Sequence, residues 1–488
     1  MPQLKYLSLA LFAVTSIGLN STYAASTMTL LSEEQMSETV GQALMSLNYI
    51  TPTDSSNPMK GILTNGQSNK IGFYKLGMEA EIELNANIKN LQLGCGGVNG
   101  AGCDIDIKNL SLSGLPSSYD AVGNPVYSEG RAATSGKMTN PFMEFAISNP
   151  ESSSTRELKG IRFSAEKIDA LLSAGVNNGA TASTTDGIQS LSGFMQIAST
   201  SGTVNTAVGT FGKKTDEVIK GNIKVLGLID SSFTSLPNDA QTQGITLPSM
   251  KVDFVTPAFQ VNGTRQSSAL IDGINITLDN IPLDSGPNNQ LAVSLNPSIL
   301  GIDYARVKLK AGSAVKNLNV GVSFSQSLSM IHNIPLRGTG GYLAMQSTSL
   351  LWPGANIAAV DRNKTNLLDM SGATDVAKTG WWMSFADPVQ LGRLEATNPV
   401  DISSVYAQVA SLMNDQLKNS DQTINLGISE AFGALTNSVI ETPKALVVDL
   451  NKATNPLLGG KPASILLQNL QLKNQNVVSN CYGSLKFC

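Results

Sequence analysis

Apolar and polar residues alternate from residue 318 to residue 330, and this period of two constrains the fold more than any other feature of the chain. The apolar positions are Leu318, Val320, Val322, Phe324, Leu328 and Met330, and the polar positions between them are Asn319, Gly321, Ser323, Ser325, Ser327 and Ser329. Successive side chains of a strand point to opposite faces of a sheet. The pattern therefore predicts a long antiparallel strand with one solvated face.

Further strands are predicted from the same period. Ile82, Leu84, Ala86 and Ile88 alternate with acidic and amide residues, which is typical of a strand with one wet face. Other predicted strands cover residues 223–228, 250–255, 274–278, 305–309 and 465–472. We expect a mainly β protein with a large antiparallel body, either a sandwich or an extended curved sheet.

Helical periodicity is limited to the two ends of the chain. Residues 32–42 begin with a capping box, with Ser32 as the N-cap and Gln35 three positions later. An apolar stripe containing Val405, Val409 and Met413 predicts a helix that begins near Ser403. A second C-terminal helix is predicted over residues 428–440.

These patterns divide the chain into four regions. We expect a signal peptide over residues 1–24, an N-terminal helix and linker over residues 25–69, a β-rich domain over residues 70–400, and a helical and strand region over residues 401–488. The β-rich domain is long enough to contain two subdomains divided near residue 200.

A short pattern recurs along the chain: apolar, any, Asn, apolar, any, apolar. Its copies begin at Ile88, Ile107, Leu278, Val315 and Leu467. Strict alternation slips by one position at the Asn of each copy. An extra residue, as in a β-bulge, would return both halves to one face, and Asn tolerates a left-handed backbone. Chance recurrence in an Asn-rich chain is the alternative.

The N-terminus has the three parts of a secretory signal peptide. Lys5 provides the positive charge, residues 7–19 form a short apolar segment, and Thr22-Tyr23-Ala24 ends in a small residue suited to cleavage. We therefore expect export to the periplasm, the cell surface or the medium. After cleavage we expect no transmembrane segment, because no later run approaches the ~18 apolar residues that a spanning helix needs.

The charge of the chain argues against nucleic acid as a partner. The formal net charge is -4 and only 14% of the residues are charged. Such a composition offers no basic face to replace phosphate counterions. A weakly charged surface is instead compatible with packing against other copies or other subunits.

The four cysteines form two local pairs, Cys95 with Cys103 and Cys481 with Cys488. In an exported chain, two small-loop disulfides are the favoured reading, although four cysteines allow three connectivities. A redox or metal site is the alternative. Against this alternative, the chain has no C-x-x-C motif, and its one histidine is distant in sequence from the cysteines.

Candidate catalytic residues are few. His332 could act as a general base, but no activated nucleophile motif accompanies it, so we interpret it as structural. Asp104 and Asp106 lie two positions apart on a predicted strand and could hold Ca²⁺ together with a loop carbonyl. A solvated strand face beside a disulfide loop is the favoured reading. We predict no enzyme activity and no cofactor.

The three tryptophans lie close together in the sequence, at Trp352, Trp381 and Trp382. They could form an aromatic platform for a glycan or an apolar ligand, but packing within a core is favoured. In a strand, the Trp381-Trp382 pair would place its two indoles on opposite faces. This segment is therefore the candidate binding surface.

Three stretches carry a resemblance to a known family. They are residues 31–42, residues 72–81 continued through the Cys95–Cys103 loop, and Trp352-Pro353-Gly354-Ala355 together with residues 380–392. With these stretches the chain resembles the exported Fil-type pilus-assembly proteins of Gram-negative bacteria over most of its length. The resemblance implies a role in assembling or forming a surface filament, and it supplies no site residues.

We therefore expect an exported, non-enzymatic structural or assembly component of a pilus-like filament. It would act by contact with other pilus or envelope proteins, or with itself, through exposed strand edges. The alternatives are a periplasmic carrier of an apolar ligand, a secreted adhesin, and a glycan-acting enzyme that uses carboxylates alone.

Overall fold

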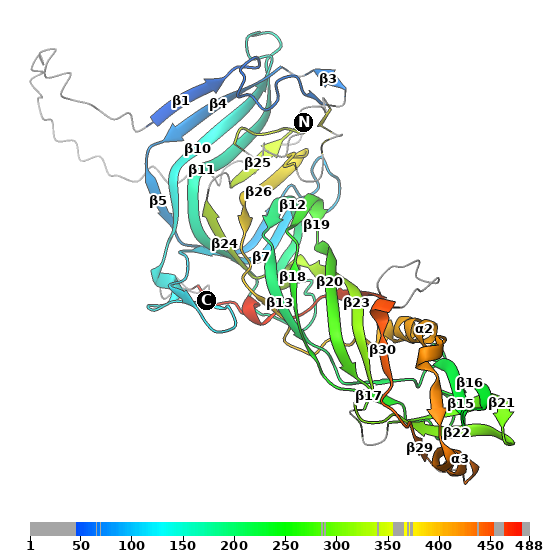
Figure 1. The fold of residues 1–488 in the computed structure, drawn as a ribbon. Coiled ribbons are helices and arrows are strands. Elements are labelled where there is room, and N and C mark those ends of the chain that lie inside the picture. The colour runs from blue at the N-terminus through cyan, green and yellow to red at the C-terminus, as the bar shows by residue number, and fades with distance from the viewer. Residues whose placement is uncertain are drawn as a thin grey trace, which may run out of the picture. The chain divides into compact units, whose positions relative to one another are not determined.

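The computed structural model describes residues 45–480, except for residues 65, 69, 285, 287–288, 339–340, 355–365, 368–369, 371–373, 437–438 and 453–462. The predicted signal peptide, the predicted helix at residues 32–42 and the Cys481–Cys488 pair lie outside the described residues. The described chain is mainly β, as predicted, with two α-helices (Figure 1).

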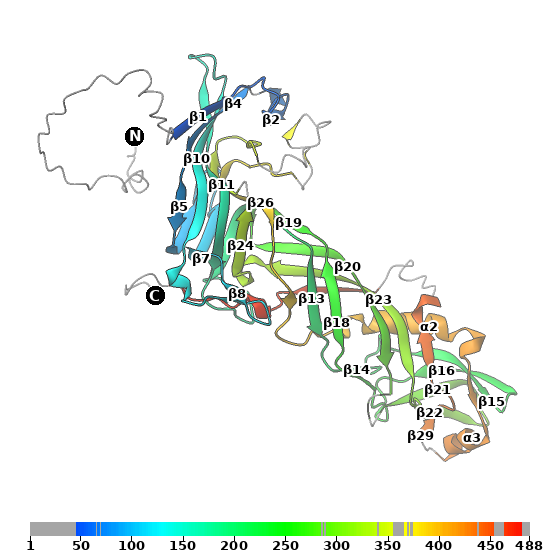
Figure 2. The same ribbon diagram turned by 60° about the vertical axis from the view of Figure 1, so that its left-hand side comes forward.

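A twelve-stranded sheet forms the first part of the structure. Along its main path lie β1 (Met45–Ile50), β4 (Ile71–Met78), β10 (Gly136–Ser148), β11 (Glu157–Ala174), β25 (Tyr342–Gln346), β26 (Gly380–Val389), β12 (Gly187–Ile197), β7 (Ile105–Ser113) and β6 (Ala86–Leu93). Three more strands pair beside this path: β5 (Glu81–Leu84), β24 (Asn333–Gly338) and β19 (Phe259–Gln266). The long strands β10 and β11 are bent, and the sheet is strongly curved (Figure 2).

Two smaller sheets continue from the first one. A three-stranded sheet contains β18 (Lys251–Thr256), β13 (Thr200–Asn205) and β27 (Leu394–Glu395). A four-stranded sheet contains β20 (Ser268–Pro282), β23 (Ala314–Ser327), β30 (Val447–Asp449) and β31 (Ala463–Gln468).

A six-stranded sheet carries the two α-helices. Its strands are β28 (Ile424–Leu426), β15 (Lys220–Val225), β16 (Ile229–Ser235), β21 (Gln290–Ile299), β22 (Ile302–Lys308) and β29 (Val439–Glu441), and the helices are α2 (Tyr406–Leu417) and α3 (Ile428–Leu435). Two-stranded ribbons are formed by β2 (Leu63–Thr64) with β3 (Gln67–Ser68), β8 (Ser118–Tyr119) with β9 (Pro125–Val126), and β14 (Gly209–Phe211) with β17 (Ile245–Leu247). The 3₁₀ turns are η1 (Arg131–Ala133), η2 (Leu328–Met330), η5 (Ser403–Val405), η6 (Ser420–Gln422), η7 (Leu450–Lys452) and η8 (Lys473–Gln475).

The C-terminal strands complete sheets that begin earlier in the chain. β28 pairs in parallel with β15, β29 with β22, and β30 and β31 with β23. Val409, Met413 and Leu417 of α2 are buried in the core between the six-stranded and four-stranded sheets. The predicted apolar stripe of this helix is therefore confirmed.

Several predicted boundaries are wrong, for local reasons. β23 ends at Ser327, whose side chain accepts a hydrogen bond from the amide of Ser329 and begins η2, so residues 328–330 are not strand. The strand predicted over residues 223–228 ends at Val225, because Leu226 has a φ of 53° and begins a turn. The predicted helix over residues 428–440 ends at Leu435, and Val439–Glu441 form β29.

Four copies of the recurring Asn pattern lie on two pairs of neighbouring strands, β6 with β7 and β20 with β23. Neither ladder has an extra residue at the pattern. Ile88 pairs with Leu110 and Asn90 with Lys108, so the register is the same before and after the pattern. The ladder between β20 and β23 is likewise unshifted, with Leu278 opposite Leu318 and Asn280 opposite Lys316. Instead, one Asn of each ladder adopts a left-handed backbone, with a φ of 54° at Asn109 and 57° at Asn317. The expected bulge is wrong, and the left-handed Asn is confirmed at these two positions and at Asn469.

Candidate functional site

A groove of about 870 Å³ runs along one face of the twelve-stranded sheet. We call it the apolar groove. Its size falls within the roughly 300–1,000 Å³ that is typical of ligand sites in proteins. Its apolar lining includes Met45, Leu76, Met78, Ile82, Leu112, Met138, Met143, Phe163, Ile168, Leu171, Leu172, Leu336, Leu343, Met383, Phe385, Val389 and Leu391.

The strand register creates a continuous band along the groove. Leu76 on β4 lies opposite Met143 on β10, and Met143 lies opposite Phe163 on β11. Phe163 in turn lies opposite Leu343 on β25, which lies opposite Met383 on β26. Neighbouring strands are about 4.8 Å apart, so five strands give an apolar band roughly 19 Å long.

A second row of cross-strand neighbours runs beside this band. Ile82 on β5 lies opposite Met138, and Met138 lies opposite Ile168. The left-handed backbone of Asn140, with a φ of 49°, interrupts the alternation of β10. Met138 and Met143, although five positions apart, therefore both reach the groove.

Some side chains of the two rows are exposed, whereas Met143, Leu343 and Met383 are partly buried. Phe163 is 45% exposed, Leu76 is 38% exposed and Ile82 is 37% exposed. The strand predicted over residues 82–88 is divided at Asn85 into β5 and β6. On β5 no packed layer of described residues covers the apolar face. Glu81 and Glu83 project to the other face, where both pair with Lys137.

Methionine is prominent in the lining, at Met45, Met78, Met138, Met143 and Met383. A thioether side chain is unbranched and polarisable, so it adapts to ligands of irregular shape. Arg337 and Asp387 are the charged residues among the described lining. The lining therefore brings together no pair of carboxylates of the kind that a glycosidase uses.

One end of the groove is polar. The side chain of Gln475 accepts hydrogen bonds from the backbone amides of His332 and Asn333 at 2.8 and 3.0 Å. Asn474 donates from Nδ2 to the carbonyl oxygen of Leu391 at 2.7 Å. The Oδ1 atoms of Asn333 and Asn474 are buried and have no hydrogen-bond partner among the described residues. Buried acceptors without a partner are unusual in native proteins, and both residues belong to the lining of the groove.

The cysteine prediction is confirmed for the first pair. Cys95 and Cys103 form a disulfide in the loop between β6 and β7. This loop packs against Asp104, whose side chain is 2% exposed. The disulfide lies outside the lining of the apolar groove.

Asp104 and Asp106 are held by protein groups. Asp104 pairs with Arg265 at 3.1 Å and also accepts hydrogen bonds from Asn99 and from the amide of Trp381. Asp106 pairs with Lys108 at 2.9 Å. Within the described part of the chain, no three His, Cys, Asp or Glu side chains gather as a metal site would require. The calcium interpretation therefore has no support from this geometry.

The tryptophans do not line the groove, as far as the described lining extends. Trp352 and Trp382 are fully buried in a core with Phe73 and Phe194, whereas Trp381 packs on a different core. The indoles of the Trp381-Trp382 pair thus lie in different cores, as expected for adjacent strand residues.

Trp382 is held by a buried polar cluster. Its Nε1 donates to Asp375 at 3.0 Å, and Tyr342 and Ser384 donate to the other oxygen of that carboxylate. Burial raises the pKa of Asp375, although these hydrogen bonds act in the opposite direction. The cluster is enclosed and satisfied, which fits a structural role.

His332 is a core residue. Its Nδ1 lies 2.6 Å from the carbonyl oxygen of Ala174, and burial lowers its pKa. The neutral ring with a proton on Nδ1 donates this hydrogen bond. This contact agrees with the structural interpretation of His332.

Comparison of the chain with protein-family models, with curated proteins and with solved structures finds no match. Among the described residues, no helix has the length and apolar character needed to cross a bilayer. Sequence reasoning missed the apolar groove. The sequence feature that indicates the groove is the group of Met, Leu and Ile residues on strands β4, β5 and β10, but the sequence does not show which strands lie side by side.

Proposed function

We propose that the chain is an exported, non-enzymatic binding protein that holds an elongated amphiphile in the apolar groove. The observation that carries the proposal is the continuous band of apolar cross-strand neighbours from Leu76 to Met383, which lines the groove. An almost uncharged, elongated apolar surface matches the hydrocarbon chain of a lipid. Export is the expectation from the N-terminal sequence.

The polar end of the groove indicates the chemistry of the ligand's head. Oδ1 of Asn333 and Oδ1 of Asn474 are buried acceptors that need donors. A head group with hydroxyl or amine donors would satisfy both atoms once the two side chains turned toward the groove. We therefore favour an acyl lipid with a donor-bearing head over a simple hydrocarbon.

A fluorescent fatty acid, cis-parinaric acid, provides a direct test. The protein should bind this probe, and Phe163→Ser and Ile82→Ser should each weaken binding by about tenfold, because one apolar side chain buried by a ligand contributes on the order of 1.5 kcal/mol. Leu158→Ser is the matched control. Leu158 is also on β11 and is 49% exposed, but it does not line the groove. Native mass spectrometry of protein from the cell envelope should also show bound lipid.

Either of two results would overturn this proposal. If the probe fails to bind the unmodified protein, or if Leu158→Ser weakens binding as much as Phe163→Ser does, the groove is not a lipid site. Circular dichroism of each variant would establish that it is folded.

A second candidate function, a subunit or assembly factor of a pilus-like filament, is favoured by one other feature. Among the described strands, β1 pairs only with β4 and forms an edge of the sheet, with Met45 56% exposed and Leu47 73% exposed. An exposed edge strand can accept a strand from another chain. In that case Asn48→Pro, which removes a backbone donor, should abolish self-association or partner binding, whereas a protein that stays monomeric and binds no envelope partner would exclude this function.

A further inference from the structure

Two hairpins of the six-stranded sheet have an unusual turn chemistry. The turn between β15 and β16 contains Leu226-Gly227, and the turn between β21 and β22 contains Leu300-Gly301. Leu226 has a φ of 53° and Leu300 a φ of 52°. Tight hairpin turns with positive φ strongly favour Asn or Asp before Gly, because a leucine side chain is strained there.

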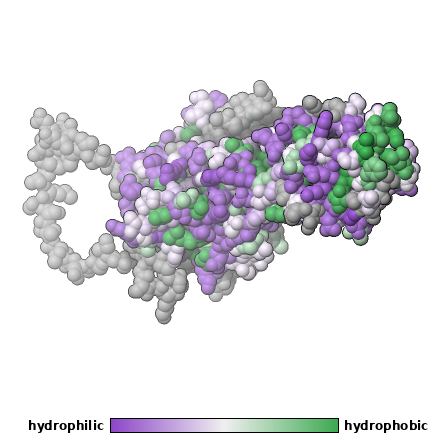
Figure 3. Space-filling view, turned by 60° about the horizontal axis from the view of Figure 1, so that its bottom comes forward, coloured by the Kyte–Doolittle hydropathy of each residue, from purple (hydrophilic) through white to green (hydrophobic). Residues whose placement is uncertain are grey.

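The two turns lie at the same end of the sheet as the start of α3. β16 pairs with β21 with Phe233 opposite Leu295, so the β15–β16 and β21–β22 turns are neighbours. The amide of Leu226 donates to the carbonyl oxygen of Leu426, two residues before α3. Figure 3 shows hydrophobic residues gathered on the surface where these elements meet.

The large apolar side chains of this region face solvent. Leu228 is 84% exposed, Ile428 is 66% exposed and Phe432 is 63% exposed. Leu226 and Leu300 are also exposed, at 43% and 57%. We call these five residues the α3 patch. A contiguous exposed apolar patch of this kind marks an interaction site.

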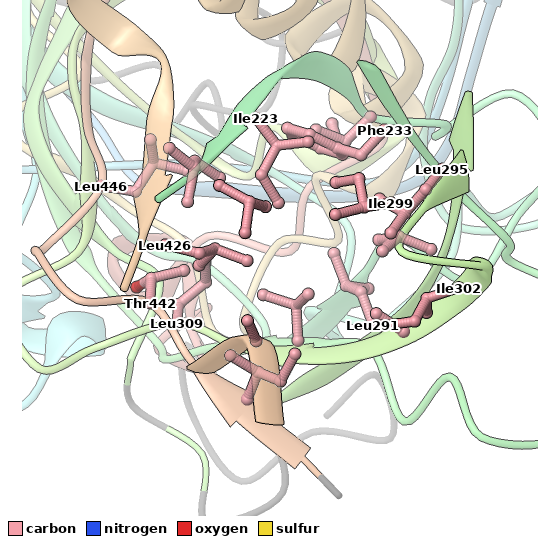
Figure 4. Close-up of a pocket in the computed structure, with 18 of the residues that line it drawn as sticks. Ile223, Phe233, Leu291, Leu295, Ile299, Ile302, Leu309, Leu426, Thr442 and Leu446 are labelled. Carbon is pink, nitrogen blue, oxygen red and sulfur yellow. The ribbon is translucent and has the colours of Figure 1, made fainter. Parts of the chain in front are cut away.

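The described apolar side chains of helix α3 differ in exposure. Ile428 and Phe432, four positions apart and therefore on one face, point outward, while the small Ala431 is buried. A cavity of about 60 Å³ lies on the buried side, lined by Ala431 and by residues that include Ile299, Leu426 and Leu446 (Figure 4). The core thus has unfilled space while Ile428 and Phe432 of the helix face outward.

The charged residues behind the patch are one basic and three acidic. Lys224 and Asp230 form an ion pair at 3.2 Å behind the first turn, Asp303 follows the second turn, and Glu430 lies on α3. The turn residues themselves carry no charge. The α3 patch is uncharged and has charged residues behind it. Such a surface is complementary to the hydrocarbon and zwitterionic head-group layers of a phospholipid bilayer. It lacks the excess of basic residues that an anionic membrane or a nucleic acid would attract.

We infer that the α3 patch inserts into the interface of a phospholipid bilayer. The inserted elements are the two Leu-Gly turns and the outer face of α3. This inference is independent of the ligand in the apolar groove, because the two sites share no lining residue.

Vesicles of phosphatidylcholine provide the test, with the exported full-length protein in a flotation assay. The unmodified protein should float with the vesicles, with little dependence on salt concentration. The double variant Leu226→Asn/Leu300→Asn should bind at least about tenfold more weakly, because two apolar side chains are lost from the inserted surface. Asn is better suited than Leu to a left-handed backbone, so this variant should be no less stable than the original.

Phe432→Ser tests the helix separately and should also weaken binding. The control is Val98→Asn, which removes a 71% exposed apolar side chain in the Cys95–Cys103 loop and should float as the original protein does. Phe163→Ser in the apolar groove should also leave flotation unchanged, which separates the two sites. Three results would each overturn the inference: no flotation of the original protein, flotation that survives the Asn substitutions, or a shift from dimer to monomer caused by them, since that shift would make a second copy the partner.

Discussion

Nε of Arg265 lies 3.1 Å from Oδ1 of Asp104, and the same guanidinium donates to the carbonyl oxygens of Gly100 and Gly102 at 3.2 Å each. Arg265 comes from β19, whereas the other three residues belong to the disulfide loop between β6 and β7. One side chain therefore neutralises a buried carboxylate and also attaches the loop to the neighbouring strands.

Arg265→Ala should destabilise the protein by about 2 kcal/mol. Removing one partner of a fully buried ion pair costs about 3–5 kcal/mol, and the partial exposure of Arg265 reduces that figure. The free energy of unfolding from urea denaturation measures this change. Lys137→Ala, which removes the exposed pair with Glu81, is the control and should leave the urea midpoint unchanged. Equal effects of the two substitutions would refute the role of Arg265.

Glu144 and Arg162 form a second buried pair, 2.5 Å apart and only 1% and 3% exposed. Arg162 also lies over the rings of Phe142, Tyr342 and Trp352. Arg162→Met should cost about 3 kcal/mol, because it leaves a carboxylate buried without its cation. The double variant Glu144→Gln/Arg162→Met should be less destabilised than the single Arg162→Met variant. Urea denaturation of the cycle measures the coupling, and strictly additive losses would count against it.

Strand alternation predicted the β class and the positions of several strands, but it did not locate the long strands β10 and β11. It predicted those several strands because burial on one face imposes a period of two, as in Val320, Val322 and Phe324 of β23. The local disulfide was also predictable, because Cys95 and Cys103 are neighbours in sequence and thus in space. Both inferences depend on short-range information.

The apolar groove and the α3 patch depend on long-range information that the sequence does not display. Alternation shows that Ile82 and Leu84 share a face, but whether another layer covers that face is decided by strand pairing. The Leu226-Gly227 turn was predicted as strand, because leucine does not indicate a turn, whereas an Asn-Gly pair would have indicated one. Sequence analysis therefore missed the apolar groove and the α3 patch, because both depend on which strands and turns lie side by side in the folded chain.

The single histidine gives a simple pH experiment. Burial holds the pKa of His332 below its ordinary value of about 6.5, while the hydrogen bond to Ala174 and the charge of Asp186 act in the opposite direction. As pH falls below about 6.5, the unfolded chain therefore takes up a proton more readily than the folded protein, and stability decreases. His332→Gln should lose less stability than the original protein between pH 7.5 and pH 5. An NMR titration of the one imidazole should give a pKa below 6.5, and a value above it would contradict this account.

The left-handed asparagines permit a matched test within one ladder. Asn317 has a φ of 57°, and its Nδ2 donates to Asp449 at 2.8 Å, whereas the corresponding Asn280 on the facing strand is exposed and has no left-handed backbone. Asn317→Leu should cost about 2 kcal/mol, from backbone strain together with the lost hydrogen bond. Asn317→Gly should cost only about 1 kcal/mol, because glycine adopts this backbone freely. Asn280→Leu should change stability by less than about 0.5 kcal/mol. If Asn280→Leu proved as damaging as Asn317→Leu in thermal and urea unfolding, the effect would belong to the sequence pattern and not to the left-handed backbone that one copy of it adopts.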